Sequence, residues 1–123
     1  MTIEKIKNDI ALLFLKQNKA YKEMVFIRKQ DEWFGAFYGN ELIATAGYSY
    51  KKGYITLGGC FTVLQFRKKG IQSLLLLKIL HETKGKLIIS FSRPEMARIN
   101  EKYGFKTKYT YKNGTKKMEF DNE

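Results

Sequence analysis

Apolar residues near the start of the chain recur at spacings of three and four, the rhythm of one face of an α-helix. The pattern predicts an amphipathic helix over about residues 3 to 17 that packs on the rest of the fold. The next apolar run, residues 24–29, is short and fits a strand or the end of a second helix, and of the two a strand is expected. The apolar positions of the predicted helix are Ile3, Ile6, Ile10, Leu13 and Phe14.

Three β-prone runs follow, each rich in aromatic and branched residues. Residues 33–38 and 41–50 are joined by Gly39-Asn40, and a third run occupies residues 54–63. Short glycine-containing turns of this kind join antiparallel neighbours. The three runs therefore predict an antiparallel meander.

The middle of the chain changes to a helical pattern and then back to a strand. Residues 69–81 are apolar over most of a helical circumference and predict a buried helix. Residues 87–91 are continuously apolar apart from Ser90 and predict a buried strand. Because this strand follows a helical crossover, we expect it to run parallel to the strand at residues 54–63.

The last part of the chain predicts a short helix and a hairpin. Pro94 suits the first turn of a helix over about residues 96–103. Asn113-Gly114, a strong hairpin signal, joins two β-prone runs at residues 105–111 and 115–120. The order of elements predicts a single α/β (α+β) domain over the whole chain, residues 1–123. Its mixed sheet would contain an antiparallel meander, then a helix, a parallel strand, a helix and a C-terminal hairpin.

Composition narrows the class of protein. A chain of 123 residues with 44% hydrophobic and 15% aromatic residues can form one core and is not disordered. No run approaches the ~18 apolar residues that span a bilayer, and the start lacks a signal peptide, so we expect a cytoplasmic protein without a membrane partner. The single cysteine, Cys60, excludes an internal disulfide, and with one histidine, His81, no metal site is expected.

The formal net charge of +11 favours a polyanionic partner such as nucleic acid or a phosphorylated cofactor. The excess falls in two tracts without acidic residues, residues 42–81 and residues 102–118. One tract would suffice for a cofactor. The second leaves nucleic acid open as a partner.

The first tract contains a strand, a basic turn and a helix. The first N–H groups of a helix lack intrahelical partners, and the helix dipole adds partial positive charge there. Arg67, Lys68 and Lys69 bring three cations to this end, and Gly70 lacks the Cβ that would hold a diphosphate away from the backbone. Gly58-Gly59, earlier in the strand, predicts a bulge or a close approach by a ligand. The pattern predicts a site for a phosphate-bearing cofactor or substrate.

The run Arg67-Lys68-Lys69-Gly70-Ile71-Gln72 resembles the signature of the GCN5-related N-acetyltransferase (GNAT) superfamily, from which only Gln72 departs. Lys102-Tyr103-Gly104-Phe105 resembles the family's helix-to-strand ending. The resemblance covers residues 33–120 and implies a divergent member with a shortened N-terminal region. It implies acetyl-CoA, or another acyl-CoA, as co-substrate, with backbone groups along the pantetheine arm and around the pyrophosphate. The residues so implied are Phe61, Thr62, Val63, Arg67, Lys68, Lys69, Gly70, Ile71, Gln72 and Ser73.

The family's usual catalytic groups are missing. The strand before the turn, residues 54–63, has no carboxylate to act as a base. The family's tyrosine acid would fall at Asn100, whose amide can only hydrogen-bond the cofactor. Tyr103 is the phenol to test first, and Ser90 and Ser92 are candidates to meet the acyl region. Catalysis would then rest mainly on positioning and on strand N–H groups that polarise the carbonyl.

Other side chains of the sequence could serve the same chemistry. Cys60 lies on the strand but has no partner base, so a buried structural role is expected. His81 lies ~16 Å along the helix from the anion end, too far from the acyl group. Glu32, Glu41 and Glu95 remain candidates for a remote base that acts through water.

Three functions are compatible with these residues. The first is an acyl-CoA-dependent N-acyltransferase that acts on a small-molecule or macromolecular amine. The second is a nucleic-acid base-modifying enzyme, because residues 34–43 loosely resemble the early hairpin of the phage Mom-type adenine-modifying proteins. The third is a non-catalytic nucleic-acid-binding protein on a decayed enzyme scaffold. Surplus charge and interleaved aromatic residues support the last two, the aromatic residues being Tyr48, Tyr50, Tyr109 and Tyr111.

Overall fold

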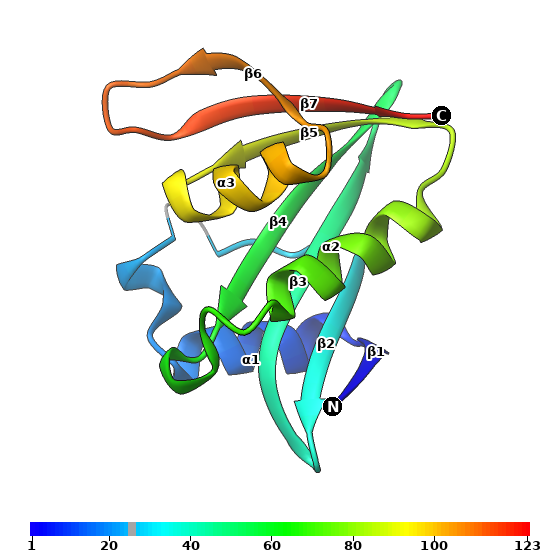
Figure 1. Cartoon of the computed structure of the whole chain (residues 1–123). Helices are drawn as coiled ribbons and strands as arrows, with labels where there is room; N and C mark the ends of the chain where they lie inside the picture. The colour runs from blue at the N-terminus through cyan, green and yellow to red at the C-terminus, as the bar shows by residue number, and fades with distance from the viewer. Residues whose placement is uncertain (25–26) are drawn as a thin grey trace.

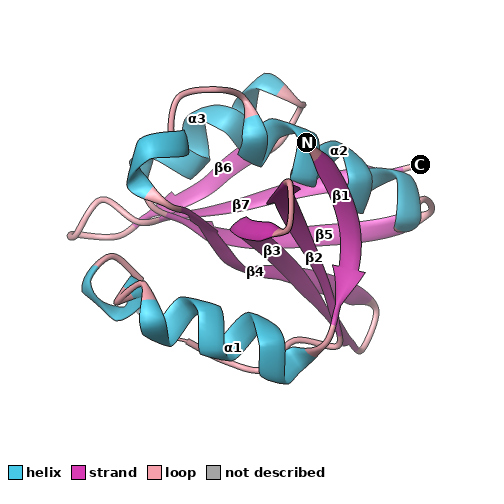
Figure 2. Ribbon diagram, turned by 90° about the horizontal axis from the view of Figure 1, so that it is seen from below, coloured by secondary structure: helices cyan, strands magenta, loops and turns pink. Residues whose placement is uncertain are grey.

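The computed structural model describes residues 1–24 and 27–123 and shows a mixed sheet covered by helices on both faces (Figure 1). The seven strands lie in the order β1-β2-β3-β4-β5-β7-β6. Helix α1 covers one face, and α2 and α3 cover the other (Figure 2). The elements are β1 (Thr2–Ile6), α1 (Asn8–Gln17), η1 (Ala20–Lys22), β2 (Glu32–Tyr38), β3 (Glu41–Lys51), β4 (Tyr54–Thr62), η2 (Leu64–Phe66), α2 (Ile71–Glu82), β5 (Lys86–Ser92), α3 (Pro94–Lys102), β6 (Lys106–Thr110) and β7 (Lys116–Asn122).

The structure confirms the predicted order of strands from β2 onward. Strands β2, β3 and β4 form the antiparallel meander, and β5 runs parallel to β4. Strands β6 and β7 form the closing hairpin, with β7 next to β5 and β6 at the edge of the sheet. Pro94 is at the start of α3, as predicted. No helix among the described residues is long and apolar enough to cross a membrane.

The prediction for the N-terminal part was wrong. A single helix over residues 3 to 17 was expected, but Thr2–Ile6 forms β1, antiparallel to β2, and the helix begins only at Asn8. In a strand, residues three apart point to opposite faces. Accordingly, Ile3 packs on the core under α2 and Ile6 packs on the core under α1. A spacing of three therefore suits a strand buried on both faces as well as a helix.

Two further expectations need correction. Met24 and residues 27–29 are not part of a strand, and the rest of the strand predicted at residues 24–29 lies outside the described residues. Helix α2 is not buried all round, because the side chains of Leu74 and Leu77 are each 44% exposed. Its buried face consists of Ile71, Leu75, Leu76 and Ile79.

Strand β4 contains the predicted bulge. The pairing of β3 with β4 shifts register between Gly47–Gly58 and Thr45–Phe61, and Gly59 has a φ of +67°. A Cβ at Gly59 would lie 2.2 Å from the ring of Trp33, so only glycine fits there. Thr45 Oγ1 donates a hydrogen bond to the Gly59 carbonyl at 2.8 Å. The bulge bends the last part of β4.

Candidate functional site

The middle of the sheet opens between β4 and β5. These two strands pair only at Ile55–Ile88 and Thr56–Ile89, close to the start of both strands. Beyond this point β4 keeps β3 as its neighbour and β5 keeps β7, and the two strands diverge (Figure 1). Residues 57–62 of β4 therefore have an edge that faces a gap rather than another strand.

The pairing of β4 with β3 shows which backbone groups face the gap. Val63 N–H donates to the Ile43 carbonyl at 2.9 Å, and Phe61 lies opposite Thr45 two residues away, so both residues direct their backbone groups to β3. Thr62, between them, directs its N–H and C=O away from β3 and toward the gap, where its C=O accepts from Arg67 Nε at 2.7 Å. Of the three residues expected along a pantetheine arm, only Thr62 offers such an N–H group.

The N-terminus of α2 lies at the end of this strand and offers unbonded donors. Gly70 caps the helix in the left-handed region, with a φ of +80°, and a Cβ there would meet no atom within 4 Å. The first bonded N–H is that of Leu74, which donates to the Gly70 carbonyl at 3.1 Å. Within the described part of the chain, no acceptor takes the N–H groups of residues 68–73. This stretch of backbone is equipped to bind an anion.

The side chains of Arg67 and Gln72 are engaged inside the fold. Arg67 Nε donates to the Thr62 carbonyl at 2.7 Å, and its guanidinium pairs with the Glu23 carboxylate at 2.9 Å. Gln72 Nε2 donates to the Thr45 carbonyl and to Thr62 Oγ1, both at 3.1 Å. These two side chains hold the turn and the helix against the end of β4. Lys68 and Lys69 are exposed and are the cations of the turn that remain for a phosphate.

A buried polar cluster lies where β5 meets α3. Asn100, Ser90 and Ser92 are 0%, 4% and 5% exposed. Asn100 Nδ2 donates to Ser90 Oγ at 3.2 Å and to Ser92 Oγ at 2.9 Å, and the two hydroxyls bond to each other. One of the two hydroxyl protons is used in that mutual bond. The other hydroxyl proton has no acceptor among the described residues. Asn100 Oδ1 has no hydrogen-bond partner in the described structure.

Tyr103 does not join this cluster. It follows the last turn of α3, is half-buried against the main core, and lies under Lys102 Nζ, 5.9 Å from the ring centre. The sequence therefore located three polar residues that meet, Ser90, Ser92 and Asn100, and a tyrosine that stands apart.

Cys60 and His81 have no catalytic environment. Burial raises the pKa of the Cys60 thiol to about 12, so the thiol is protonated at neutral pH. His81 lies in the last turn of α2, at the opposite end of the helix from Gly70. The place of His81 agrees with the expectation from sequence, whereas Cys60 is half-buried against the main core rather than buried as expected.

Sequence reasoning missed Glu23 and Thr45. Glu23 pairs with Arg67, and Thr45 holds the bulge and accepts from Gln72 through its carbonyl. Both contacts join residues far apart in the chain, so no local pattern indicates them.

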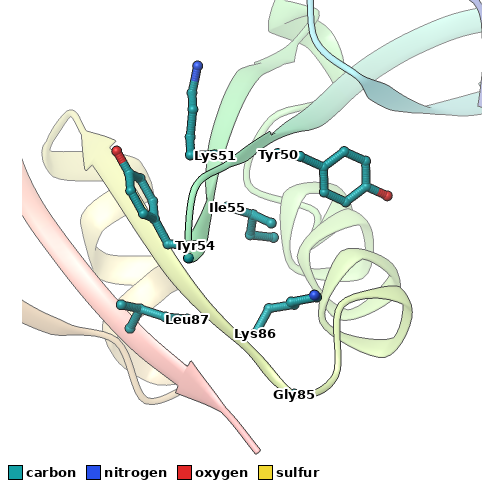
Figure 3. A pocket seen from close by; sticks show the side chains of 8 residues that line it. Tyr50, Lys51, Tyr54, Ile55, Gly85, Lys86 and Leu87 are labelled. Atoms are coloured by element: carbon teal, nitrogen blue, oxygen red, sulfur yellow. The ribbon is translucent and has the colours of Figure 1, made fainter.

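A hollow of about 200 Å³ lies at the other end of β4 (Figure 3). It is lined by the β3–β4 turn and the start of β5, where the two strands are still paired. It is separate from the gap beyond Thr56. Its labelled lining residues are Tyr50, Lys51, Tyr54, Ile55, Gly85, Lys86 and Leu87.

Comparison with known proteins shows which solved structures share this fold. No family model and no curated protein matches the sequence. Among solved structures, YncA from Salmonella typhimurium with acetyl-CoA aligns with a TM-score of 0.78 at 14% identity, over 100% of this chain and 94% of that one. The ribosomal-protein-S18-alanine N-acetyltransferase of Escherichia coli aligns with a TM-score of 0.72 at 15% identity, over 99% and 94%. The Bacillus subtilis N-acetyltransferase YlbP in complex with coenzyme A aligns with a TM-score of 0.67 at 16% identity, over 98% and 95%. The chain has the fold of GNAT-type acetyltransferases, as its motifs predicted.

Proposed function

We propose that this chain is an acyl-CoA-dependent N-acyltransferase that transfers an acetyl group from acetyl-CoA to an amine. One observation carries the proposal: the unpaired edge of β4 leads directly to the unbonded N–H groups of residues 68–73. An edge of this kind suits an extended amide-containing arm, and a group of free N–H donors suits a phosphate. Acyl-CoA contains both an amide-containing arm and a diphosphate in one molecule. Structural neighbours that contain coenzyme A or acetyl-CoA support the assignment.

The diphosphate would be held mainly by backbone. The N–H groups of residues 68–73 supply directed donors, and the dipole of α2 adds partial positive charge. Lys68 and Lys69 would add long-range attraction as exposed surface cations. Gly70 leaves open space beside this backbone, which a side chain would fill.

The acyl arm would lie along the end of β4. The N–H group of Thr62 would donate to an amide carbonyl of the arm in the manner of an added strand. Acetyl-CoA supplies a thioester, whose carbonyl becomes negatively charged as the amine attacks. A fixed strand N–H directed at that oxygen stabilises the developing charge.

Transfer forms a bond between the amine nitrogen and the acyl carbon and breaks the bond between that carbon and sulfur. The amine proton passes to water, and the departing thiolate takes a proton from water. The uncommitted hydroxyl proton of the Ser90–Ser92 pair is our candidate hydrogen-bond donor to the thiolate, with Asn100 orienting both hydroxyls. Tyr103 is the candidate for direct donation of a proton to the thiolate.

The deciding experiment compares two glycine variants by calorimetry with acetyl-CoA. Gly70 and Gly53 have φ values of +80° and +85°, and neither would bring a Cβ within 4 Å of other atoms. Gly70→Glu and Gly53→Glu therefore impose similar backbone strain, but only the first places a carboxylate at the proposed diphosphate site. We expect Gly70→Glu to weaken binding more than tenfold and Gly53→Glu to leave it unchanged. Equal affinities of the two variants, or no binding of CoA esters by the original protein, would refute the proposal.

A further inference from the structure

One half of the sheet has an uncovered face. Helix α3 packs on one side of β5 and β7, whereas α1 packs on Trp33 and Phe61 in the other half of the sheet (Figure 2). On the uncovered side, Phe91, Tyr109 and Tyr111 are 55%, 58% and 42% exposed. Three large rings are therefore in contact with solvent: Phe91 on β5, and Tyr109 and Tyr111 on and just after β6, with β7 between β5 and β6.

The strand register puts these rings on one surface. Phe91 of β5 lies opposite Lys117 of β7, and Lys117 lies opposite Tyr109 of β6. The neighbouring pair Ser90–Met118 is buried on the α3 side, so the Phe91–Lys117–Tyr109 row points the other way. The Tyr111 ring packs edge-on against Tyr109, with centroids 4.7 Å apart. We name Phe91, Tyr109, Tyr111 and Lys117 the open aromatic face.

Lysines surround this face. Among the described residues, Lys108, Lys112 and Lys117 have no recorded acidic partner, whereas Lys116 pairs with Glu101 at 3.4 Å. The nearest acids of β7 are Glu119, opposite Lys106, and Asp121 beyond it. The charge is therefore positive at the end that carries the rings and mixed at the other end.

We infer that the open aromatic face binds single-stranded nucleic acid. Exposed rings on a sheet stack unpaired bases, and lysines beside them contact phosphates. Phe91 and Tyr109 are two strands apart, roughly 10 Å, with Lys117 between them to reach the backbone. An acidic peptide would use the lysines but would leave three rings without a partner. Rings and cations together favour a ligand that has both π-faces and negative charge.

The position of the face adds a further reason. Phe91 and Ser92 end β5, the strand that borders the gap beyond Thr56. A bound strand would pass beside the proposed acyl site. Binding itself does not depend on acyl transfer and can be measured without acetyl-CoA, so the two proposals can fail separately.

The test is fluorescence anisotropy of labelled single-stranded RNA and DNA of about 16 nucleotides, the upper site size of a comparable binding fold. We expect Tyr109→Ala and Tyr111→Ala each to weaken binding at least about fivefold, with an unchanged salt dependence. Lys117→Ala should reduce the slope of log affinity against log salt by about 0.7, since one phosphate contact is lost. Tyr109→Phe, which keeps the ring, should bind like the original protein.

Matched controls lie elsewhere on the surface. Tyr21, on η1, is 57% exposed, and Lys16 is an exposed lysine at the end of α1. Tyr21→Ala and Lys16→Ala should leave affinity unchanged, and circular dichroism confirms the folding of each variant. The inference is overturned if the oligonucleotides do not bind at low salt, if the controls weaken binding as much as Tyr109→Ala, or if polyglutamate or anionic vesicles bind more tightly than either nucleic acid.

Discussion

At the scale of single residues, environment decides which polar groups are reactive. Cys60 borders the proposed thioester site, yet burial raises the pKa of its thiol to about 12, compared with about 8.5 in an unfolded chain. A neutral thiol is a poor nucleophile. We therefore regard Cys60 as a structural residue that shares the strand with the site, and expect Cys60→Ser to keep transfer activity.

The same pKa shift gives a testable pH dependence. The folded protein holds the thiol proton to higher pH than the unfolded chain does, so the associated stability is complete below about pH 8.5 and is lost as pH rises toward 12. We expect urea unfolding to show a larger loss of stability between about pH 7 and about pH 10 in the original protein than in Cys60→Ala, by about 2 kcal/mol. Other groups titrate in both proteins and cancel. Identical losses would show that the thiol is not buried as described.

The sequence identified the residues of the polar cluster but not the hydrogen bonds between them. The position of Asn100 before Gly104 marked it as a replacement for a tyrosine, and Ser90 and Ser92 were identified from their place at the end of a strand. What the sequence could not show is that Asn100 donates to both hydroxyls. That contact depends on how α3 sits on β5, which packing determines.

At the scale of elements, the bulge in β4 is the feature on which the site depends most. Gly59→Ala would place a Cβ 2.2 Å from the Trp33 ring at a φ of +67°. The ring cannot move easily, because Trp33 Nε1 donates to Asn8 Oδ1 at 2.6 Å and the side chain is 2% exposed. We expect a loss of about 2–4 kcal/mol in the free energy of urea unfolding.

The matched control for this variant is Gly58→Ala. A Cβ there would lie 2.3 Å from Gln30 Nε2, the far end of a flexible side chain that can move aside. We expect a loss of about 1 kcal/mol, since Gln30 would give up its bond from Ser49 Oγ. If both variants lose the same stability, the Trp33 contact does not define the bulge.

Elements with local signals were predicted well, and elements fixed by distant pairing were not. The Asn113-Gly114 turn and the Pro94 helix start are local, and both predictions were confirmed. β1 was predicted as helix because its identity depends on pairing with β2, as in Ile3–Ala36. The gap between β4 and β5 has no local signal, since it arises where two strands from distant parts of the chain stop pairing and diverge.

At the scale of the molecule, the two halves of the sheet share few bonds. Only the pairs Ile55–Ile88 and Thr56–Ile89 join β4 to β5, and the proposed acyl-CoA site lies where pairing stops. A ligand with one end on α2 and its arm along β4 would fill the place of missing sheet contacts. Binding should therefore stabilise the whole fold and not only the turn.

We expect acetyl-CoA at about 100 times its dissociation constant to add about 2.7 kcal/mol to stability and to raise Tm on the order of 10 °C. Hydrogen exchange should slow most at residues 57–62 and 68–73, where the ligand binds, and also in β1, where the gain in global stability acts. Tripolyphosphate, which has the charge but no acyl arm, should raise Tm less, and Gly70→Glu should lose the shift that Gly53→Glu retains. A shift from tripolyphosphate equal to that from acetyl-CoA would mean that charge alone is recognised, and the edge of β4 would then have no part in binding.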